Sequence, residues 1–428
     1  MAKKTINKEL TGAQDLYNFL FEACNIIRGP VSQDNFKDYI TPLLYYKRIS
    51  DVYDEETEEA LISSGGDKEY ASLPEQHRFV IPDGCHWQEV RERTENLGAA
   101  IVGAMRQIEI ANPDTLYGVL SMFSSQKWTN KAILNDSKIR DLIEHLSKRK
   151  LGNKDYPADL MGDAYEILLK KFADDSKAQA GEFYTPRSVV RLLVHILDPQ
   201  PGETVYDPAC GSGGMLIEAI RYMHDDSLCC GSIFGQEKNV VNAAIAKMNL
   251  FLHGASDFNV MQGDTLRDPK ILQGGNIAKF DCVIANPPFS LENWGATEWS
   301  SDKYKRNIYG TPSDSCGDYA WIQHMICSMS SGKGRMAVVM PQGILFRGNQ
   351  EAEIRKQLVE SDLIEAVVTL GDKLFYGTGL SPCFLIIRRM KQAHHSGRIL
   401  MIDGSKILTQ KRAQNILEEN DIDRLYSL

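Results

Sequence analysis

Residues 204–214 read Thr204-Val205-Tyr206-Asp207-Pro208-Ala209-Cys210-Gly211-Ser212-Gly213-Gly214, and this stretch decides the fold. A short apolar run ends at an acidic residue, a glycine-rich turn follows, and a helical pattern begins near Met215. Glycines at a strand-to-helix turn permit positive φ angles and let a ligand approach the backbone closely. The stretch therefore predicts a strand, a tight turn and a helix, the first unit of an α/β sheet.

The residues that follow repeat this rhythm of short apolar runs separated by helical patterns. The runs expected to form strands are Thr204–Asp207, Ile233–Gln236, Asn259–Gly263, Phe280–Ala285, Arg335–Met340, Ile364–Leu370 and Cys383–Arg388. The clearest helical patterns between them are Gly214–Met223, Val240–Leu252 and Tyr319–Met329. Repeated strand and helix units predict an α/β fold with a doubly wound, largely parallel sheet that binds ligands at the carboxyl ends of its strands.

The first part of the chain has a different pattern, with amphipathic helical segments and few apolar runs typical of strands. Its clearest helical segments are Asp15–Cys24 and Phe36–Tyr53. In the second segment, apolar and aromatic residues follow a helical period that is typical of a buried face: Phe36, Tyr39, Ile40, Leu43, Leu44, Tyr46 and Ile49. We expect a mostly helical domain over residues 1–155 and a second, α/β domain over residues 156–428.

Composition restricts the class of protein. The chain has 428 residues, of which 43% are apolar and 25% are charged, as is typical of a soluble globular protein. No apolar run is long enough to span a membrane and the N-terminus does not resemble a signal peptide, so we expect a cytoplasmic protein. The nine cysteines show no C-x-x-C spacing, so neither a metal site nor a disulfide framework is indicated.

The formal net charge of −9 does not suit a protein that grips nucleic acid over its whole surface. If DNA is the substrate, the basic surface must be local or must belong to a partner.

The motif Asn286-Pro287-Pro288-Phe289 follows the apolar run at 280–285. Two adjacent prolines end the strand with a rigid backbone. The Asn286 amide oxygen and the Pro287 carbonyl are two acceptors that suit a planar NH₂ group, and Phe289 offers a flat face for stacking. The motif therefore predicts a pocket for a planar nitrogen, either the amine of adenine or a side-chain amide.

Acidic residues end the second and third expected strands. Glu237 lies 26 positions after Gly211, where a carboxylate can accept both hydroxyls of a ribose. Asp264 follows the next strand, where it can either bind an adenine amine or cap a helix. Together with the glycine turn, these residues favour an adenosine cofactor. The turn lacks the Gly-Lys-Ser/Thr of a P-loop and the G-x-G-x-x-G of a nicotinamide site.

The segment Gly181-Glu182-Phe183-Tyr184-Thr185-Pro186-Arg187 lies upstream of the first strand. We expect Thr185 to cap a helix whose first residue is Pro186. Capping does not explain the aromatic pair Phe183-Tyr184, which we expect to pack over the cofactor.

Taken in this order, the motifs resemble those of S-adenosylmethionine-dependent N6-adenine DNA methyltransferases of the γ arrangement. More closely, the chain resembles the modification subunits of type I restriction-modification systems, over almost its whole length. The resemblance includes further segments: 163–166, 341–346, 374–379 and 412–415.

The resemblance implies a Rossmann-like methyltransferase sheet with a mostly helical N-terminal domain. It also implies that the following residues bind S-adenosylmethionine: Glu182, Phe183, Tyr184, Thr185, Pro186, Arg187, Asp207, Gly211, Ser212, Gly213, Gly214, Glu237 and Asp264. The catalytic motif would be Asn286, Pro287, Pro288 and Phe289, holding the target adenine. The adenine would be flipped out of the duplex, because in-line attack on the methyl group is not possible inside the base stack.

The spacing of the motifs leaves no room for a target-recognition domain of ordinary size. Only about forty residues separate the catalytic motif from the fifth strand, and about forty follow the last expected strand. We therefore expect double-stranded DNA to be read by a separate specificity subunit. The resemblance further implies a restriction subunit and two copies of this chain in the complex.

The loop at 291–317 interleaves basic and aromatic residues, which indicates either a DNA-contacting flap or a solvated loop: Trp294, Trp299, Lys303, Tyr304, Lys305, Arg306 and Tyr309. The alternatives to the leading hypothesis are a stand-alone DNA adenine methyltransferase, a protein-glutamine methyltransferase and a scaffold without catalysis.

Overall fold

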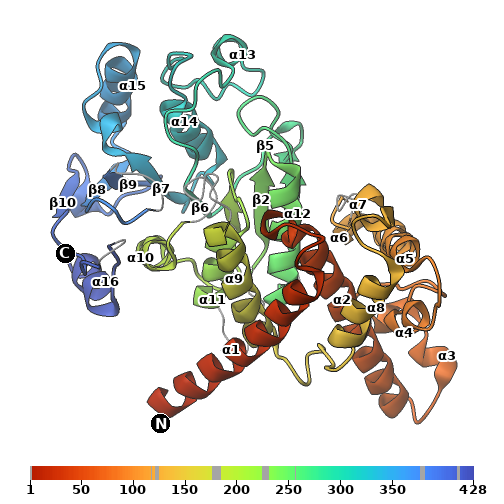
Figure 1. The fold of residues 1–428 in the computed structure, drawn as a ribbon. Helices are drawn as coiled ribbons and strands as arrows, with labels where there is room; N and C mark the ends of the chain where they lie inside the picture. Colours follow the sequence, from red (N-terminus) through yellow and green to blue (C-terminus); the bar gives the residue numbers. More distant parts are fainter. Residues whose placement is uncertain are drawn as a thin grey trace. The chain divides into compact units, whose positions relative to one another are not determined.

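The computed structural model describes residues 2–116, 118–120, 125–175, 185–223, 231–255, 257–375, 381–411 and 415–428. The chain forms two compact units (Figure 1). Unit 1 comprises Met1–Ala178 and Lys247–Gly254, and unit 2 comprises Gln179–Ala246 and Ala255–Leu428. No helix within the described ranges is both long enough and apolar enough to cross a membrane.

Unit 1 is mostly helical in its described residues, as the sequence predicts. Its α-helices are α1 (Ala2–Ile27), α2 (Lys37–Ser63), α3 (Lys68–Ala71), α4 (Trp87–Arg91), α5 (Leu97–Ala111), α6 (Pro113–Leu116), α7 (Ser125–Thr129), α8 (Asp136–Leu146) and α9 (Ala158–Asp175). α1 packs against α8 and α9. Contacts place α9 with the helices of unit 1, so the boundary expected at residue 155 stays a prediction.

α2 is the core helix of unit 1. Every residue from Tyr39 to Val52 is buried, including the whole apolar stripe expected from the sequence. The burial includes charged residues, which are paired: Lys47 forms an ion pair with Asp51, and Arg48 donates to the carbonyl oxygen of Tyr156 at 3.0 Å. A helix that is buried all round needs such partners, because an unpaired charge in the core is costly.

Unit 2 contains an eight-stranded sheet in the order β10-β8-β9-β7-β6-β1-β2-β3 (Figure 1). Its strands are β1 (Val205–Asp207), β2 (Ile233–Glu237), β3 (Phe258–Gln262), β6 (Cys282–Ala285), β7 (Arg335–Pro341), β8 (Ile364–Leu370), β9 (Pro382–Arg388) and β10 (Leu400–Gly404). Neighbouring strands are parallel except at β9, which runs antiparallel to both β7 and β8. The seven expected strands are confirmed.

Three further strands were not expected from the sequence. β4 (Leu272–Gln273) and β5 (Asn276–Ile277) form a separate two-stranded hairpin that is too short to leave a sequence pattern. β10 pairs with β8 at one edge of the sheet, and its first two residues, Leu400 and Met401, are exposed. An edge strand with exposed apolar residues lacks both the continuous apolar run of a buried strand and regular alternation.

The helices of unit 2 are α10 (Arg187–Leu197), α11 (Gly214–Met223), α12 (Val240–Leu252), α13 (Ala296–Ser300), α14 (Asp318–Ser328), α15 (Asn349–Glu360) and α16 (Glu419–Tyr426). α11 and α12 have the bounds expected from the sequence, and α14 is displaced by one residue. The end of α12, from Lys247, clusters with unit 1, where Phe251 packs edge-on against Tyr45 and Phe79.

β1 lies between β2 and β6, so the order of the strands reverses there. In a doubly wound sheet, loops from such a switch point leave a crevice at the carboxyl ends of the strands. β1 ends at Asp207 and β6 ends at Ala285, immediately before the Asn286 motif. The topology therefore places the glycine turn and the Asn286 motif side by side at the carboxyl ends of the strands.

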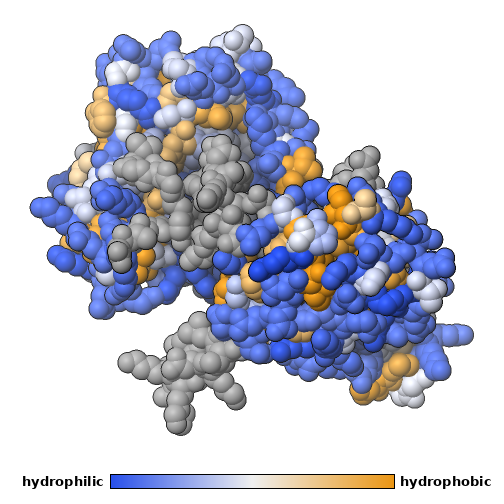
Figure 2. Space-filling model, in the orientation of Figure 1, coloured by the Kyte–Doolittle hydropathy of each residue, from blue (hydrophilic) through white to orange (hydrophobic). Residues whose placement is uncertain are grey.

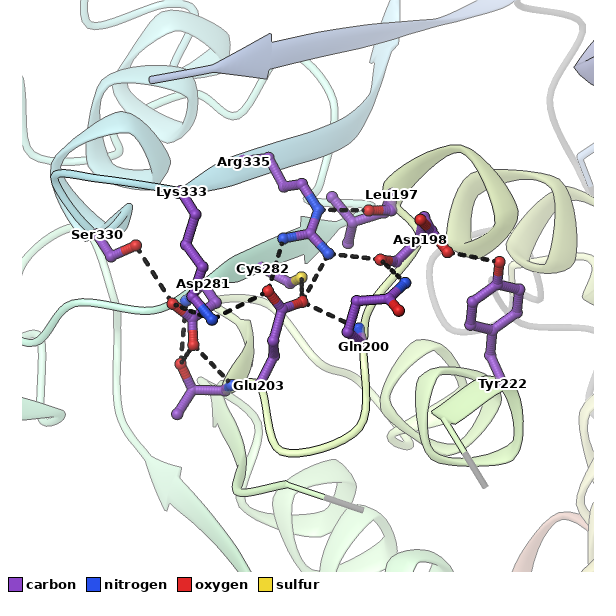
Figure 3. A network of polar contacts seen from close by, with 11 residues as sticks. Leu197, Asp198, Gln200, Glu203, Tyr222, Asp281, Cys282, Ser330, Lys333 and Arg335 are labelled. Atoms are coloured by element: carbon purple, nitrogen blue, oxygen red, sulfur yellow. Dashed lines mark hydrogen bonds and ion pairs between the residues drawn. The ribbon is translucent and has the colours of Figure 1, made fainter. Parts of the chain in front are cut away.

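The amino ends of the strands are held by a buried ion pair between Arg335 and Glu203, with Lys333 at its exposed side (Figure 3). Arg335, the first residue of β7, donates to the carbonyl oxygen of Leu197 at 2.6 Å and to Glu203 at 2.6 and 3.2 Å. Lys333 also reaches Glu203 at 3.2 Å. Burial alone would oppose ionisation, but hydrogen bonds from Arg335 and from the Gln200 N–H lower the pKa of Glu203 to about 2.

The surface drawn in Figure 2 is mostly hydrophilic, and apolar residues form only limited patches there. The seven cysteines in the described part of the chain are free thiols, and six of them are buried.

Candidate active site

The turn between β1 and α11 is shaped by its glycines and by Asp207. The Asp207 carboxylate accepts a hydrogen bond from the Ala209 N–H at 2.9 Å. Gly211 and Gly213 have φ angles of 54° and 84°, a region that favours glycine. A Cβ on Gly213 would make close but ordinary van der Waals contact with Ala246, at 3.4 Å from its Cβ. Glycine is therefore favoured at Gly213 by its backbone conformation.

A small pocket of about 60 Å³ lies over this turn. Six of its lining residues were expected from the sequence: Thr185, Asp207, Gly211, Ser212, Gly214 and Asn286. Four were not among the expected site residues: Val190, Ala209, Cys210 and Met215. Ala209 and Cys210 lie inside the glycine turn, so the motif itself points to them. Val190 and Met215 are ordinary apolar positions of α10 and α11 and carry no such signal.

Two carboxylates beside the pocket have raised pKa values. Asp207 is almost completely buried, and burial together with the nearby charge of Glu237 raises its pKa to about 8 despite the Ala209 N–H. Burial also raises the pKa of Glu237. Because a nearby positive charge favours the ionised form of a carboxylate, this arrangement suits a cationic ligand.

Glu237 and Asp264 do not line the pocket, although Glu237 contacts the glycine turn. Glu237 accepts hydrogen bonds from the N–H groups of Gly211 at 3.0 Å and Asn239 at 2.7 Å. Asp264 accepts from the Arg267 N–H at 3.3 Å and forms an ion pair with Lys238 at 2.9 Å. Glu237 thus supports the glycine turn. Asp264 supports the turn at residues 265–267, and because no helix begins there, the alternative that Asp264 caps a helix is wrong.

Asn286 reaches the pocket from the end of β6. Its Nδ2 donates to the Thr185 hydroxyl at 2.9 Å, whereas its Oδ1 is buried and has no hydrogen-bond partner among the residues that the structure describes. Pro287 is buried, Phe289 is half-buried and Pro288 is exposed. The bond to Thr185 orients the amide so that its nitrogen is occupied. The oxygen is left as a free acceptor, which costs stability unless a ligand donates to it.

The expected start of α10 is wrong by one residue. The helix begins at Arg187 with Pro186 at the N-cap position, and Thr185 makes no capping bond. The Thr185 hydroxyl instead accepts from Asn286, a residue 101 positions away that local sequence does not reveal. Arg187 lies 3.8 Å from Glu218. Glu182, Phe183 and Tyr184 lie outside the described residues.

The loop at 291–317 has its own buried core, which the sequence interpretation missed. Trp294 and Trp299 are each 2% exposed and pack edge-on against one another. Arg306 is 1% exposed and forms an ion pair with Asp302 at 2.8 Å. These three residues cannot belong to a DNA-contacting surface in this conformation. Of the seven residues expected in a flap, the exposed ones are Lys303 and Lys305.

Arg306 connects this loop to the rest of unit 2. Its guanidinium donates to the carbonyl oxygens of Thr265 at 2.8 Å and Leu266 at 2.7 Å, and it lies 4.4 Å from the centre of the Trp299 ring. The Thr265 hydroxyl in turn donates to the Pro208 carbonyl oxygen at 2.6 Å. The loop is therefore bonded, through the residues after β3, to the turn that forms the pocket.

Comparison with known families shows which family the chain belongs to. The sequence model described as N-6 DNA Methylase matches residues 156–428, more than half of the chain. The chain belongs to the N-6 DNA methylase family. A second model, described as the HsdM N-terminal domain, matches residues 16–146 of this methylase.

Curated relatives of the methylase are subunits of type I restriction enzymes. The MjaVII and MjaVIII methylase subunits of Methanocaldococcus jannaschii are 34% and 33% identical to it over 404 and 424 residues. These alignments cover 89% and 93% of this chain, and 67% and 69% of the relatives. The solved structure of a type I restriction-modification methyltransferase subunit from Streptococcus thermophilus gives a TM-score of 0.80 at 25% identity, covering 97% of this chain and 92% of that one.

The methylase is thus an adenine-N6 DNA methyltransferase of the kind found as modification subunits, and its cofactor is S-adenosylmethionine. The family, the α/β methyltransferase fold, the enzyme class and the cofactor expected from the sequence are confirmed.

Proposed function

We propose that Asn286, Pro287, Pro288 and Phe289 hold a flipped adenine at the carboxyl edge of the sheet. The observation that carries this proposal is the buried, unpartnered Oδ1 of Asn286, whose Nδ2 is already bonded to Thr185. An adenine amine can donate one hydrogen to Oδ1 and the other to the Pro287 carbonyl, while Phe289 stacks on the ring. Stacking would offset part of the cost of flipping, by about 1–3 kcal/mol.

The same pocket supports the cofactor roles. Bound S-adenosylmethionine supplies an electrophilic methyl group on a positively charged sulfur. Asp207 lines the pocket and would become ionised when the positive charge of the cofactor lowers its raised pKa, and the open backbone at Gly211, Ser212, Gly213 and Gly214 permits close approach of the cofactor. Glu237 and Asp264 would hold the adenosine half, and Thr185, Pro186 and Arg187, with the neighbouring Glu182, Phe183 and Tyr184, would cover the methionine half.

Asn286 and Pro287 then assist the transfer by position and charge. Drawing both amine hydrogens into acceptors holds the nitrogen in line with the methyl group and stabilises the positive charge that develops on it. The site requires no strong base before the attack, because the neutral amine attacks with its lone pair. The nitrogen–carbon bond would form as the sulfur–carbon bond breaks, which leaves a neutral thioether, and the methylated nitrogen would then lose one proton to water.

We infer that the methylase acts in a complex in which another subunit reads the DNA sequence. Its net charge of −9 and the burial of Arg306 leave little basic surface in the loop beside the site. A specificity subunit, a restriction subunit and two copies of this chain are the partners that we propose. The relatives' names, which place them in type I restriction enzymes, support this assembly.

The test is incubation of the reconstituted complex with duplex DNA and S-adenosylmethionine labelled in its methyl group. We expect label on the N6 of adenine, and label only on protein would refute the proposal. Asn286→Ala should lower kcat by about 100-fold or more while cofactor binding and complex assembly persist. That result would also exclude a scaffold role. Asn276→Ala, at the exposed first residue of β5, is the matched control and should leave the rate unchanged.

A further inference from the structure

The residue after the catalytic motif has an unusual backbone. Ser290 has a φ angle of 50°, in the left-handed region that non-glycine residues rarely adopt. Its N–H donates to the Asp318 Oδ1 at 2.7 Å. This N–H belongs to the peptide group that begins at the Phe289 carbonyl, so the bond sets the plane of that peptide.

Asp318 is itself held firmly. It is completely buried as the first residue of α14, and its second oxygen forms an ion pair with Arg347. Arg347 follows the turn after β7 and forms a second ion pair with Glu351 at 3.2 Å. An acidic residue at a helix start often serves the helix alone. Here, both oxygens bind groups outside α14.

These contacts lie at the point where the loop at 291–317 closes. The Gly317 N–H donates to the Leu291 carbonyl oxygen at 3.0 Å, beside the bond from Ser290 to Asp318. Because β6 and β7 are adjacent parallel strands, the loops that contain Ser290 and Arg347 leave the same edge of the sheet. Asp318 joins these two loops at the edge where Asn286 lies.

We propose that Asp318, held by Arg347, is a positioning residue for the adenine pocket. By fixing the peptide after Phe289, it holds the Phe289 ring and the Pro287 carbonyl in the geometry that receives the base. The inference rests on the proposed role of the Asn286 motif. It requires no contact between Asp318 and the substrate or cofactor.

The first test measures amide hydrogen exchange of Ser290 by mass spectrometry with residue resolution on the intact chain. The wild-type amide should be protected although the Ser290 side chain is exposed. Asp318→Ala should speed exchange by about tenfold or more, the effect of losing a charge-assisted bond that closes a local structure. An unprotected amide in the wild type, or exchange unchanged in D318A, would overturn the proposal.

The second test separates positioning from general stability. In the reconstituted complex, D318A should lower kcat by about 10- to 100-fold, as small misplacements of a reacting group do, while KM for the cofactor stays within about threefold. Asp318→Asn keeps an acceptor for the Ser290 N–H and should retain most of the activity. The matched control is Glu203→Ala, another buried carboxylate paired with an arginine but at the amino ends of the strands. It should lower Tm without lowering kcat.

A wild-type kcat in D318A would refute the inference even if Tm falls. If D318A does not fold, Arg347→Gln is measured instead, because Asp318 then loses the cation that holds it. Amide hydrogen exchange at Ser290 should become faster in R347Q. Unchanged exchange in R347Q would overturn the proposal. If the wild-type complex fails to methylate DNA, the proposed function is wrong, and the exchange measurements still decide whether Asp318 fixes the loop.

Discussion

Cofactor affinity should depend on pH through Asp207. This carboxyl lines the pocket and is almost completely buried, and its pKa is raised to about 8. In the free protein at pH 7, Asp207 is therefore mostly protonated. A sulfonium and an ammonium group entering the pocket would favour the carboxylate and lower its pKa. Binding should release a proton, and affinity should rise with pH until Asp207 is ionised in the free protein.

The magnitude follows from the pKa of the free protein. With a pKa of about 8 before binding and a value well below 6 after it, the dissociation constant should fall about 25-fold between pH 6.5 and pH 8.5, equivalent to about 2 kcal/mol. At pH 7, about 0.9 proton should leave for each cofactor bound. Above pH 9 the contribution of Asp207 to this dependence should vanish, since the free carboxyl is then already ionised.

Isothermal titration calorimetry tests both numbers, with proton release obtained from buffers of different ionisation enthalpy. Asp207→Asn is the matched variant, because the amide keeps the acceptor for the Ala209 N–H but cannot ionise. The amino group of the cofactor also titrates near pH 8, and D207N measures that contribution alone. If wild type and D207N show the same pH dependence, Asp207 does not respond to the cofactor's charge and the reasoning fails.

Three further variants test other parts of unit 2. Glu203→Gln should lower the unfolding free energy by about 3 kcal/mol at pH 7 and by about 1 kcal/mol at pH 3, because the lowered pKa of Glu203 contributes stability above pH 4.5 that disappears toward pH 2. Urea unfolding at the two pH values measures this difference. An equal loss at both pH values would contradict the prediction. Thr185→Ala should lower kcat by about 2- to 13-fold, which corresponds to the free energy of one hydrogen bond to Asn286. Thr185→Ser keeps the hydroxyl and should not lower kcat. A wild-type rate in T185A would show that Asn286 does not need this partner. Arg306→Met should lower the unfolding free energy by about 3–5 kcal/mol because it leaves the buried Asp302 unpaired, and Arg306→Lys should not restore stability because lysine lacks the planar guanidinium group. Lys303→Met, at an exposed neighbouring position, is the control. Equal denaturation midpoints for R306M and K303M would refute a structural role for Arg306.

The parts of the fold that were predictable share one physical cause. β6 and β7 are buried at every residue, so hydrophobicity alone marks them as continuous apolar runs. The same holds for the buried face of α11, which the sequence predicts with its observed bounds. β10 was missed because its pairing with β8 depends on backbone hydrogen bonds at the edge of the sheet, and its exposed side chains carry no matching pattern.

The candidate site divides in a similar way. The Asn286 motif and the glycine turn were predictable because their chemistry is local: prolines, glycines and the strands that precede them. The burial of Arg306 was not, because its carbonyl acceptors at Thr265 and Leu266 lie about 40 positions earlier in the chain. Interleaved basic and aromatic residues are compatible both with a buried arginine stacked on a tryptophan and with a DNA-binding surface. Only tertiary contacts distinguish the two.

The two ends of the strands use buried polar groups in opposite ways. At the amino ends of the strands, drawn in Figure 3, Arg335 and Glu203 form an ion pair with one another, and the pair stabilises the fold. At the carboxyl ends of the strands, the described residues give the Asn286 oxygen no hydrogen-bond partner and buried Asp207 no cation, and both conditions cost stability. Between pH 4 and pH 8, Asp207 is protonated in the folded protein but ionised in the unfolded chain. The free energy of unfolding that Asp207 takes away therefore grows as pH rises through that range. D207N should therefore be more stable than the wild type at pH 8.5 while binding the cofactor less tightly, as expected where a ligand's charge, and not the fold, completes the site.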